Sequence, residues 1–375
     1  MPTISVNEGQ TNFYYEDSGP PLDQPGNTYT TLILLHGTYW TSGIFRPLIP
    51  YARERNLRLV LLNQRNYPGS SPYNEEDLRI MQSQDEQIQR PMVREHGRIQ
   101  GQVIAQLIQT LNIPPLRSNS DGSLTGGLSF VAWSAGNIIL FQFMSSLDTL
   151  DGPNRSLIES RLRSIVLYEP AMYISGTNPY FVSREAENRS SGLWSPIRDK
   201  NVVSQVNELF ESWISTYFAV VSQLPSFDPA DHEATHDLMH ERKALDKAPT
   251  STRLEKDIGY DKFWFVASNL RQIKPELLRE NVLRSLTRLE ASDGGNWSLH
   301  PGFKAVLVWC DQSATDCILG ASAISQYHSE WQRQGYQMRS LEVVKITDAN
   351  HFRKPQSPIV NSLGYSHPLF TGTFR

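Results

Sequence analysis

The stretch that surrounds Ser134 constrains this chain more than any other. Leu128–Trp133 is largely apolar and favours a β-strand, whereas Ile138–Met144 is an apolar run that favours a buried helix. The small residues Ala132 and Gly136 lie two positions before and after the serine. Where a strand turns sharply into a helix the two segments pass close together, so larger side chains at these positions would clash. We therefore expect a strand, a tight turn with the serine at its tip, and a helix.

Length and composition place limits on the function. With 375 residues the chain exceeds the size at which one core stops growing, so we expect a large core with an inserted subdomain. The net charge of −4 argues against a nucleic-acid partner, and no apolar run is long enough to span a bilayer. The only cysteines, Cys310 and Cys317, suit a reducing compartment, and the first residues do not resemble a signal peptide. We predict a cytoplasmic protein of ordinary globular composition, without a membrane partner.

Strand patterns alternate with helical patterns along most of the chain. A turn-rich centre in residues 4–15 predicts an N-terminal hairpin. Continuous apolar runs, typical of strands buried on both faces, predict a mostly parallel sheet with helices on both sides. These runs are Thr31–Leu35, Leu57–Leu62, Leu128–Trp133, Arg163–Tyr168, Lys304–Trp309 and Leu341–Ile346.

The pattern changes between residues 172 and 299. Strand signals fade there, and long helical patterns with many aromatic residues take their place. We predict that residues 172–299 form a helical subdomain, inserted into an α/β core made of residues 1–171 and 300–375.

Five residues with chemically useful side chains follow predicted strand ends: His36, Ser134, Glu169, Asp311 and His351. The carboxyl ends of parallel strands meet at one edge of a sheet, and sites in such sheets form there. We therefore expect these side chains to gather at one rim.

The chain resembles the α/β-hydrolase family over nearly its whole length. The matching segments are His36-Gly37-Thr38, Arg65–Ser70, Ala132–Gly136 and Ala349–Phe352, and they occur in the family's order. The resemblance implies that the helical insertion of residues 172–299 is the family's cap or lid, and it implies a serine hydrolase that needs no cofactor. In it, Ser134 is the nucleophile of the strand–turn–helix motif, called the nucleophile elbow. His351 is the general base, because an imidazole can accept and return a proton near neutral pH.

Three carboxyl groups are candidates for the third member of the triad, which orients the imidazole. Many relatives place the acid after the seventh core strand in a Gly-x-x-Asp pattern, but the corresponding residue here is Ser313. Other relatives place it after the sixth strand, where this chain has Glu169. We favour Glu169, with Asp311 and then Asp316 as alternatives.

The oxyanion hole requires two backbone N–H donors. The residue after the nucleophile, Ala135, should supply one of them. The loop after His36 should supply the other, and we expect it from Thr38, with Tyr39 as a substitute. We interpret Arg65 as part of a structural loop and not as a catalytic residue.

A competing motif lies in the predicted cap. His232-Glu233-Ala234-Thr235-His236 matches the HExxH pattern of zinc proteases, and His240 follows at helical spacing. Helices that carry this motif are usually buried, but Asp231 and Asp237 flank it here and Ala234 is its only apolar residue. We interpret the segment as a solvated helix face and predict no functional metal. The spacing of the two cysteines likewise fits no redox motif.

The function that these residues predict is hydrolysis of a carboxylester or lactone in a small, apolar and cyclic substrate. The ester is favoured because its leaving group needs less help than an amide's, and the aromatic cap favours an apolar pocket. An amide or C–C bond hydrolase, an acyltransferase, and a non-hydrolytic receptor on the same fold remain alternatives. The oligomeric state cannot be read from the sequence.

Overall fold

A computed structural model describes the chain over residues 2–21, 28–177, 213–226, 228, 242–247, 270, 272–287 and 299–352. Most of the predicted cap and the HExxH segment lie outside these residues. The predicted division into a core and a cap therefore stays a prediction.

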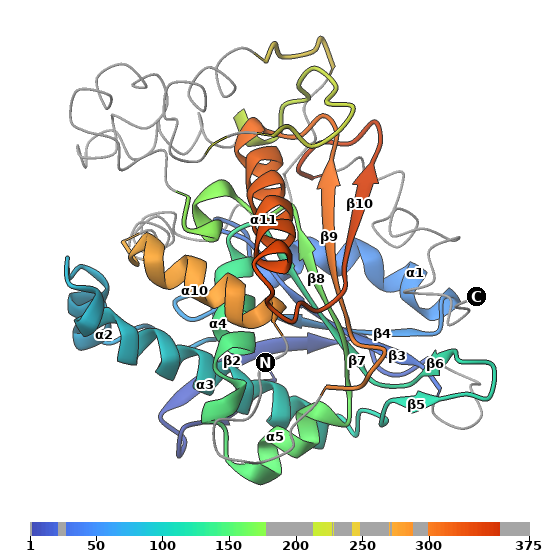
Figure 1. Cartoon of the computed structure of the whole chain (residues 1–375). Helices are drawn as coiled ribbons and strands as arrows, with labels where there is room; N and C mark the ends of the chain where they lie inside the picture. The colour runs from blue at the N-terminus through green and yellow to red at the C-terminus, as the bar shows by residue number, and fades with distance from the viewer. Residues whose placement is uncertain are drawn as a thin grey trace.

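An eight-stranded sheet forms the centre of the molecule (Figure 1). Its order is β1-β2-β4-β3-β7-β8-β9-β10. The first two strands form an antiparallel hairpin, β2 pairs antiparallel with β4, and all the remaining neighbours are parallel. The bounds are β1 (Thr3–Val6), β2 (Thr11–Asp17), β3 (Thr30–Leu35), β4 (Leu57–Leu62), β7 (Leu128–Trp133), β8 (Leu162–Tyr168), β9 (Lys304–Cys310) and β10 (Leu341–Ile346). The expected N-terminal hairpin and mostly parallel sheet are both confirmed.

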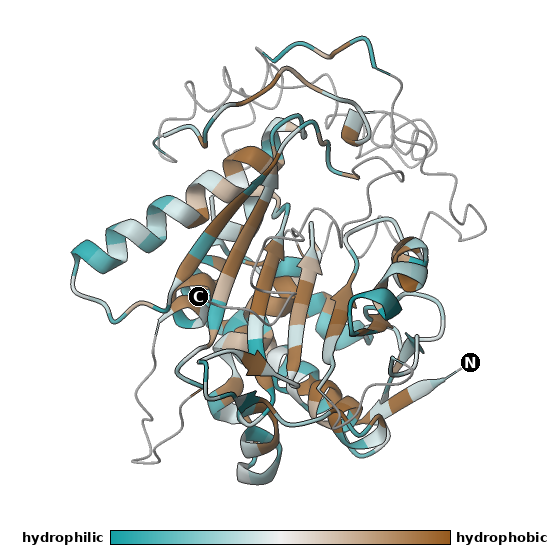
Figure 2. Ribbon diagram, turned by 90° about the vertical axis from the view of Figure 1, so that its right-hand side faces the viewer, coloured by the Kyte–Doolittle hydropathy of each residue, from teal (hydrophilic) through white to brown (hydrophobic). Residues whose placement is uncertain are grey.

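The burial of each strand follows its place in the sheet. Every residue of β3, β4, β7 and β8 is buried, as their continuous apolar sequences predict. The edge strand β10 is only partly buried, although it too is rich in valine and isoleucine. Figure 2 shows the central strands in the colour of hydrophobic residues. A strand buried on both faces leaves its carboxyl end as the place where polar side chains can reach solvent or a ligand.

Helices cover both faces of the sheet, as expected. On one side lie α3 (Glu86–Thr110), α4 (Gly136–Ser145), α10 (Pro275–Leu286) and α11 (Thr315–Arg333), with α1 (Ile49–Glu54) on the other (Figure 1). The remaining elements are α2 (Glu75–Met81), α5 (Gly152–Glu159), the short 3-10 helices η1 (Ser42–Leu48), η2 (Leu147–Thr149) and η3 (Met172–Ser175), and the small hairpin β5 (Arg117–Ser118) and β6 (Leu124–Thr125). Among the helices that the structure describes, none has both the length and the apolar composition needed to cross a membrane.

Alternating side chains of each strand enter different hydrophobic clusters. In β3, Ile33 and Leu35 pack with α3 and α4, whereas Leu32 and Leu34 pack with the aliphatic and aromatic residues of η1 and α1. Close approach of α3 and α4 depends on Gly97, because a Cβ there would lie 2.1 Å from the carbonyl oxygen of Gln142. The two clusters hold the sheet between its helices, and the strand ends are positioned by this packing.

Two helical segments begin in distinct ways. Residues 42–54 start as the 3-10 helix η1, which contains Pro47, and continue as α1. Helix α3 begins at Glu86, because the Asp85 side chain accepts a hydrogen bond from the Gln87 N–H, 2.8 Å away, and caps it. Helix α10 lies inside the range predicted for the cap, but its buried residues belong to the same cluster as those of α4.

Candidate active site

Ser134 occupies a strained turn at the carboxyl end of β7. It follows Trp133, the last residue of the strand, and has a φ of 52°. This left-handed conformation costs a residue other than glycine about 1–3 kcal/mol and persists only where the surroundings hold it. Here the Ser134 N–H donates to the Tyr168 carbonyl (2.9 Å), and the Asn137 side-chain amide donates to the Ser134 carbonyl (2.8 Å). The turn projects a half-buried serine side chain from an otherwise buried strand end.

The small residues around the turn are required by close packing. A Cβ on Gly136 would lie 2.6 Å from the carbonyl oxygen of His36, so the first turn of α4 abuts the end of β3. A Cβ on Gly37 would lie 2.7 Å from the Ser134 Cβ and 3.3 Å from its Oγ. The loop after β3 therefore passes directly beside the serine. The Ala132 methyl is tolerated at a fully buried position of β7.

The two expected oxyanion donors, Thr38 and Ala135, directly follow the two residues of this contact, Gly37 and Ser134. Ala135 is the N-cap residue of α4, where the first backbone N–H groups of a helix have no partner within it. Thr38 is buried and directly follows Gly37. Tyr39, the substitute candidate, donates its N–H to the Tyr67 hydroxyl (3.2 Å), and its φ is 87°. Because that amide already has a structural partner, Thr38 remains the candidate from this loop.

His36 fastens the same loop and is not part of the reacting group. Its Nε2 accepts the Gln64 N–H (3.1 Å), which leaves the proton on Nδ1, and Nδ1 donates to the Gly37 carbonyl (2.7 Å). Complete burial lowers the pKa of His36 from 6.5 to about 4, so the ring is neutral at neutral pH. The Gln64 side chain donates in turn to the His36 carbonyl.

His351 and Glu169 meet at the carboxyl edge of the sheet. His351 lies in the turn after β10 and is 1% exposed, and Glu169 follows β8 directly and is fully buried. The distance from His351 Nδ1 to Glu169 Oε2 is 3.1 Å. The His351 ring packs against the ring of Trp133, with centroids 4.9 Å apart, and Trp133 directly precedes Ser134. The structure thus joins the imidazole and the carboxyl group, and the ring of the residue that precedes the serine turn contacts the same imidazole.

Glu169 has a full set of partners, as a buried carboxyl group requires. Its Oε1 accepts the Cys310 N–H (2.6 Å), and its Oε2 accepts the Ser313 hydroxyl as well as His351 Nδ1. Its backbone is held in a left-handed conformation with a φ of 50°. Ser313 occupies the position where many members of the family that the sequence resembles carry the acid, and here its hydroxyl donates to an acid that follows the neighbouring strand.

The two alternative carboxyl groups have other surroundings. Asp311 Oδ1 accepts the Ala349 N–H (3.4 Å), and burial raises the pKa of this carboxyl group. Asp311 thereby fastens the turn that carries His351. Asp316 is buried in the first turn of α11. Among the described residues, the carboxyl group recorded as hydrogen-bonded to His351 is that of Glu169.

Cys317 is a neighbour of the histidine that the sequence did not indicate. Its Sγ lies 3.3 Å from His351 Nδ1, so the Nδ1 proton faces both the Glu169 carboxylate and this sulfur. Burial, together with the negative charges of Glu169 and Asp316, raises the pKa of the Cys317 thiol. The thiol is therefore protonated at neutral pH and is not a competing nucleophile. No local sequence pattern places a residue of α11 against the turn after β10.

Aromatic side chains line the sheet edge beside Ser134. The ring of Trp40 lies 4.7 Å from Phe352 and 5.7 Å from Trp133, measured between centroids. The rings of Trp133 and Phe352 contact the imidazole of His351, with centroids 4.9 Å and 5.4 Å away. An apolar wall of this kind suits a largely apolar ligand.

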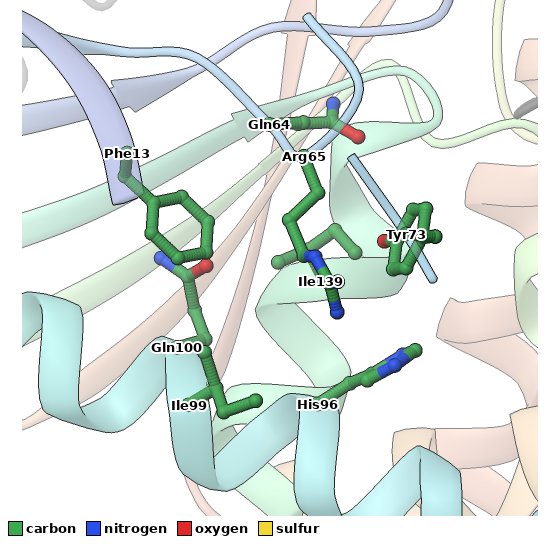
Figure 3. Close-up of a pocket in the computed structure, with 8 residues that line it drawn as sticks. All are labelled: Phe13, Gln64, Arg65, Tyr73, His96, Ile99, Gln100 and Ile139. Carbon is green, nitrogen blue, oxygen red and sulfur yellow. The ribbon is translucent and has the colours of Figure 1, made fainter. Parts of the chain in front are cut away.

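A small hollow, shown in Figure 3, is separate from these residues. Its lining includes Arg65, Tyr73 and His96. The Arg65 guanidinium stacks over the Tyr73 ring at 4.3 Å and pairs with Asp77 at 3.0 Å. These contacts agree with the interpretation of Arg65 as a structural residue.

No protein-family model and no curated protein sequence matches this chain. Among solved structures, a bromoperoxidase from Bacillus anthracis is 12% identical, with a TM-score of 0.51 and 99% of each chain covered. Est816, described as an N-acyl homoserine lactone degrading enzyme, is 12% identical over 100% of both chains, with a TM-score of 0.49. An esterase from Exiguobacterium antarcticum is also 12% identical, with a TM-score of 0.46 and coverage of 93% of this chain and 91% of that chain. The similarity to the bromoperoxidase, at a TM-score of 0.51 and 12% identity, concerns the fold alone.

Proposed function

The chain has the α/β-hydrolase fold, and from this premise we propose that it is a serine hydrolase that cleaves an ester bond through an acyl-enzyme on Ser134. The observation that carries the proposal is the hydrogen bond between Glu169 and His351 beside the strained turn of Ser134. A buried carboxyl group, an imidazole and a serine on three separate strand ends are the parts that nucleophilic acyl transfer requires.

In the proposed mechanism His351 takes the Ser134 proton on Nε2 as the hydroxyl oxygen attacks the substrate carbonyl. The Glu169 carboxylate accepts a hydrogen bond from the Nδ1–H group, which keeps Nε2 free to act as the base and stabilises the imidazolium that forms. The imidazolium then protonates the leaving alkoxide. In the second half of the reaction His351 activates a water molecule, which attacks the acyl-enzyme and releases Ser134.

The proposed oxyanion hole consists of the backbone N–H groups of Ala135 and Thr38. The positions of the two residues support this role, since one caps α4 and the other follows the glycine that touches Ser134. Loss of a single oxyanion donor typically costs about 10²–10³-fold in turnover. The backbone contacts of His36 hold this loop before substrate arrives.

For the substrate we propose a carboxylester or lactone of a small, apolar, cyclic compound. Support comes from the ring cluster of Trp40, Trp133 and Phe352 next to His351. The proposal includes a helical cap formed by residues 172–299. It also includes a cytoplasmic location, which the two free, buried cysteines support.

The test is covalent labelling with a fluorophosphonate probe, followed by peptide mass mapping. We expect an adduct on Ser134 in the wild type, no adduct in Ser134→Ala, and a much slower reaction in Glu169→Gln. Hydrolysis of p-nitrophenyl esters and of acylated lactones then ranks the two bond types. A folded wild type that neither reacts with the probe nor turns over an ester would refute the proposal and favour a ligand-binding protein.

A further inference from the structure

Three side chains of metal-binding types converge behind the imidazole of His351. The Cys317 sulfur, the His351 Nδ1 and a Glu169 oxygen all lie within 4.8 Å of one another, and all three residues are buried. They come from α11, from the turn after β10 and from the end of β8. We propose that this cluster is a site for a soft or borderline divalent cation such as Zn²⁺, and that the bound cation inhibits the enzyme. The inhibition rests on the proposed function, whereas the metal site does not.

Two of the three separations between donor atoms already match a tetrahedral zinc centre. Zinc binds sulfur at about 2.3 Å and nitrogen or oxygen at about 2.0–2.2 Å, so neighbouring ligands of a tetrahedron are about 3.4 Å apart. In this structure Nδ1 and Sγ are 3.3 Å apart, and Nδ1 and Oε2 are 3.1 Å apart. The cation can therefore be accepted with small movements of the three side chains, and a water molecule would complete the tetrahedron.

The donor set selects the class of cation. A thiolate and an imidazole favour Zn²⁺, Cd²⁺ or Co²⁺, whereas Mg²⁺ and Ca²⁺ require sets of oxygen ligands. The surroundings also orient the ligands as the outer shell of a metal site does. The Cys310 N–H holds Oε1 of Glu169 and leaves Oε2 directed at the cluster, while the Trp133 ring packs against His351.

Binding would disable His351 by changing its tautomer. A metal on Nδ1 moves the imidazole proton from Nδ1 to Nε2, and the Cys317 thiol releases its proton to solvent. Nε2 is the atom that takes the Ser134 proton in the proposed mechanism, and a protonated Nε2 cannot accept it. Holding the imidazole in the wrong tautomer lowers turnover about 10⁴-fold in the serine-protease triad. The cation would thus inhibit by acting behind the histidine, without contact with Ser134.

The first experiment reports metal binding without any activity. We would titrate the full-length wild type with Co²⁺ and record the near-ultraviolet absorption band that arises from thiolate-to-cobalt charge transfer. We expect the band in the wild type and in Cys310→Ala, a matched control that removes the chain's other buried cysteine. We expect no band in Cys317→Ser or Cys317→Ala. A metal held by the histidines of His232–His236 would give no thiolate band, and absence of the band in the wild type would overturn the proposal.

The second experiment measures inhibition. We would follow the rate of fluorophosphonate labelling against Zn²⁺ concentration, with each variant normalised to its own metal-free rate and its fold checked by circular dichroism. We expect Zn²⁺ to slow the wild type and Cys310→Ala, with full recovery after chelation. For Cys317→Ser the inhibition constant should rise by at least about tenfold. Loss of a residue that only supports a metal ligand typically weakens metal affinity by about 10–100-fold, and loss of a ligand should cost no less.

The two proposals fail in different ways. A cobalt–thiolate band in a protein that does not label would retain the metal site and reject the hydrolase. Labelling that Zn²⁺ inhibits equally in the wild type and in Cys317→Ser would retain the hydrolase and reject this site as the inhibitory one.

Discussion

Acidification should destabilise the folded protein through His36, which binds no substrate in the proposed mechanism. This ring is fully buried and neutral, with Nε2 accepting from Gln64 and Nδ1 donating to Gly37. Its pKa is about 4 in the folded protein, against 6.5 for an unperturbed histidine. Between these two pH values the unfolded chain binds a proton that the folded protein does not bind.

The sign and size of the effect follow from this difference. The folded-state pKa is depressed, so the stabilising contribution is complete above pH 6.5 and is lost as the pH falls toward 4. The interval of about 2.5 pH units, at about 1.36 kcal/mol per unit, corresponds to a loss of about 3 kcal/mol. About 2 kcal/mol of it should be lost between pH 7 and pH 5. This is a large part of the 5–15 kcal/mol that stabilises a typical protein.

The assay is urea denaturation at a series of pH values, for the wild type and His36→Asn. Asparagine retains a donor for the Gly37 carbonyl but does not titrate. We expect His36→Asn to be less stable at pH 7 by about 1–3 kcal/mol, because the Gln64 N–H loses its acceptor. The difference between the two proteins should shrink as the pH falls, since only the wild type loses the histidine contribution. The control variant His300→Asn leaves His36 intact, so it should lose as much stability on acidification as the wild type. A difference in the free energy of unfolding between the wild type and His36→Asn that stays constant from pH 7 to pH 4.5 would refute the reasoning.

Four further substitutions test the site and the packing that holds it. Gly37→Ala inserts a methyl group 2.7 Å from the Ser134 Cβ, so we expect fluorophosphonate labelling to slow by about 10²-fold with little change in secondary structure by circular dichroism. Glu169→Gln should lower ester turnover by about 10⁴-fold and Asp311→Asn by less than about tenfold, and the reverse order would overturn the choice of acid. Gly97→Ala forces a Cβ to within 2.1 Å of a carbonyl oxygen of α4, which should cost about 1–3 kcal/mol in urea denaturation. Its labelling rate per folded molecule should stay at the wild-type value.

The sheet and its rim were predictable because their determinants are local. The bounds of β4 and β10 match the runs predicted for them. For β4 the reason is that a strand buried on both faces requires apolar residues along nearly its full length. Since parallel strands place their carboxyl ends at one edge, the order of the segments sufficed to bring Ser134, Glu169 and His351 to one rim. The small residues around the serine were predictable for the same reason, since close approach excludes a Cβ at Gly136.

The contacts between rim residues were not predictable, because they depend on loop paths that no periodic pattern describes. The sequence left three carboxyl groups as possible partners of His351, and the distance to Glu169 Oε2 depends on the turns after β8 and β10. It also left two possible oxyanion donors, and the hydrogen bond from the Tyr39 amide to Tyr67 joins residues 28 positions apart. Cys317 lies 34 positions before the histidine it touches, so nothing in its own surroundings along the chain indicates the contact.

The position of the acid shows how a departure from a motif can be compensated by the neighbouring strand. Strands β8 and β9 are adjacent and parallel, and neighbouring strands lie about 4.8 Å apart. An acid that follows either strand can therefore approach the same imidazole. The glutamate side chain is one methylene group longer than that of aspartate, which extends its reach from the end of β8. Ser313 then occupies the place of the missing carboxyl group, and its hydroxyl donates to Glu169 Oε2. Because Ser313 is uncharged, it adds no second negative charge beside Glu169. A carboxylate at the Ser313 position would raise the free-energy cost of burying the Glu169 carboxylate.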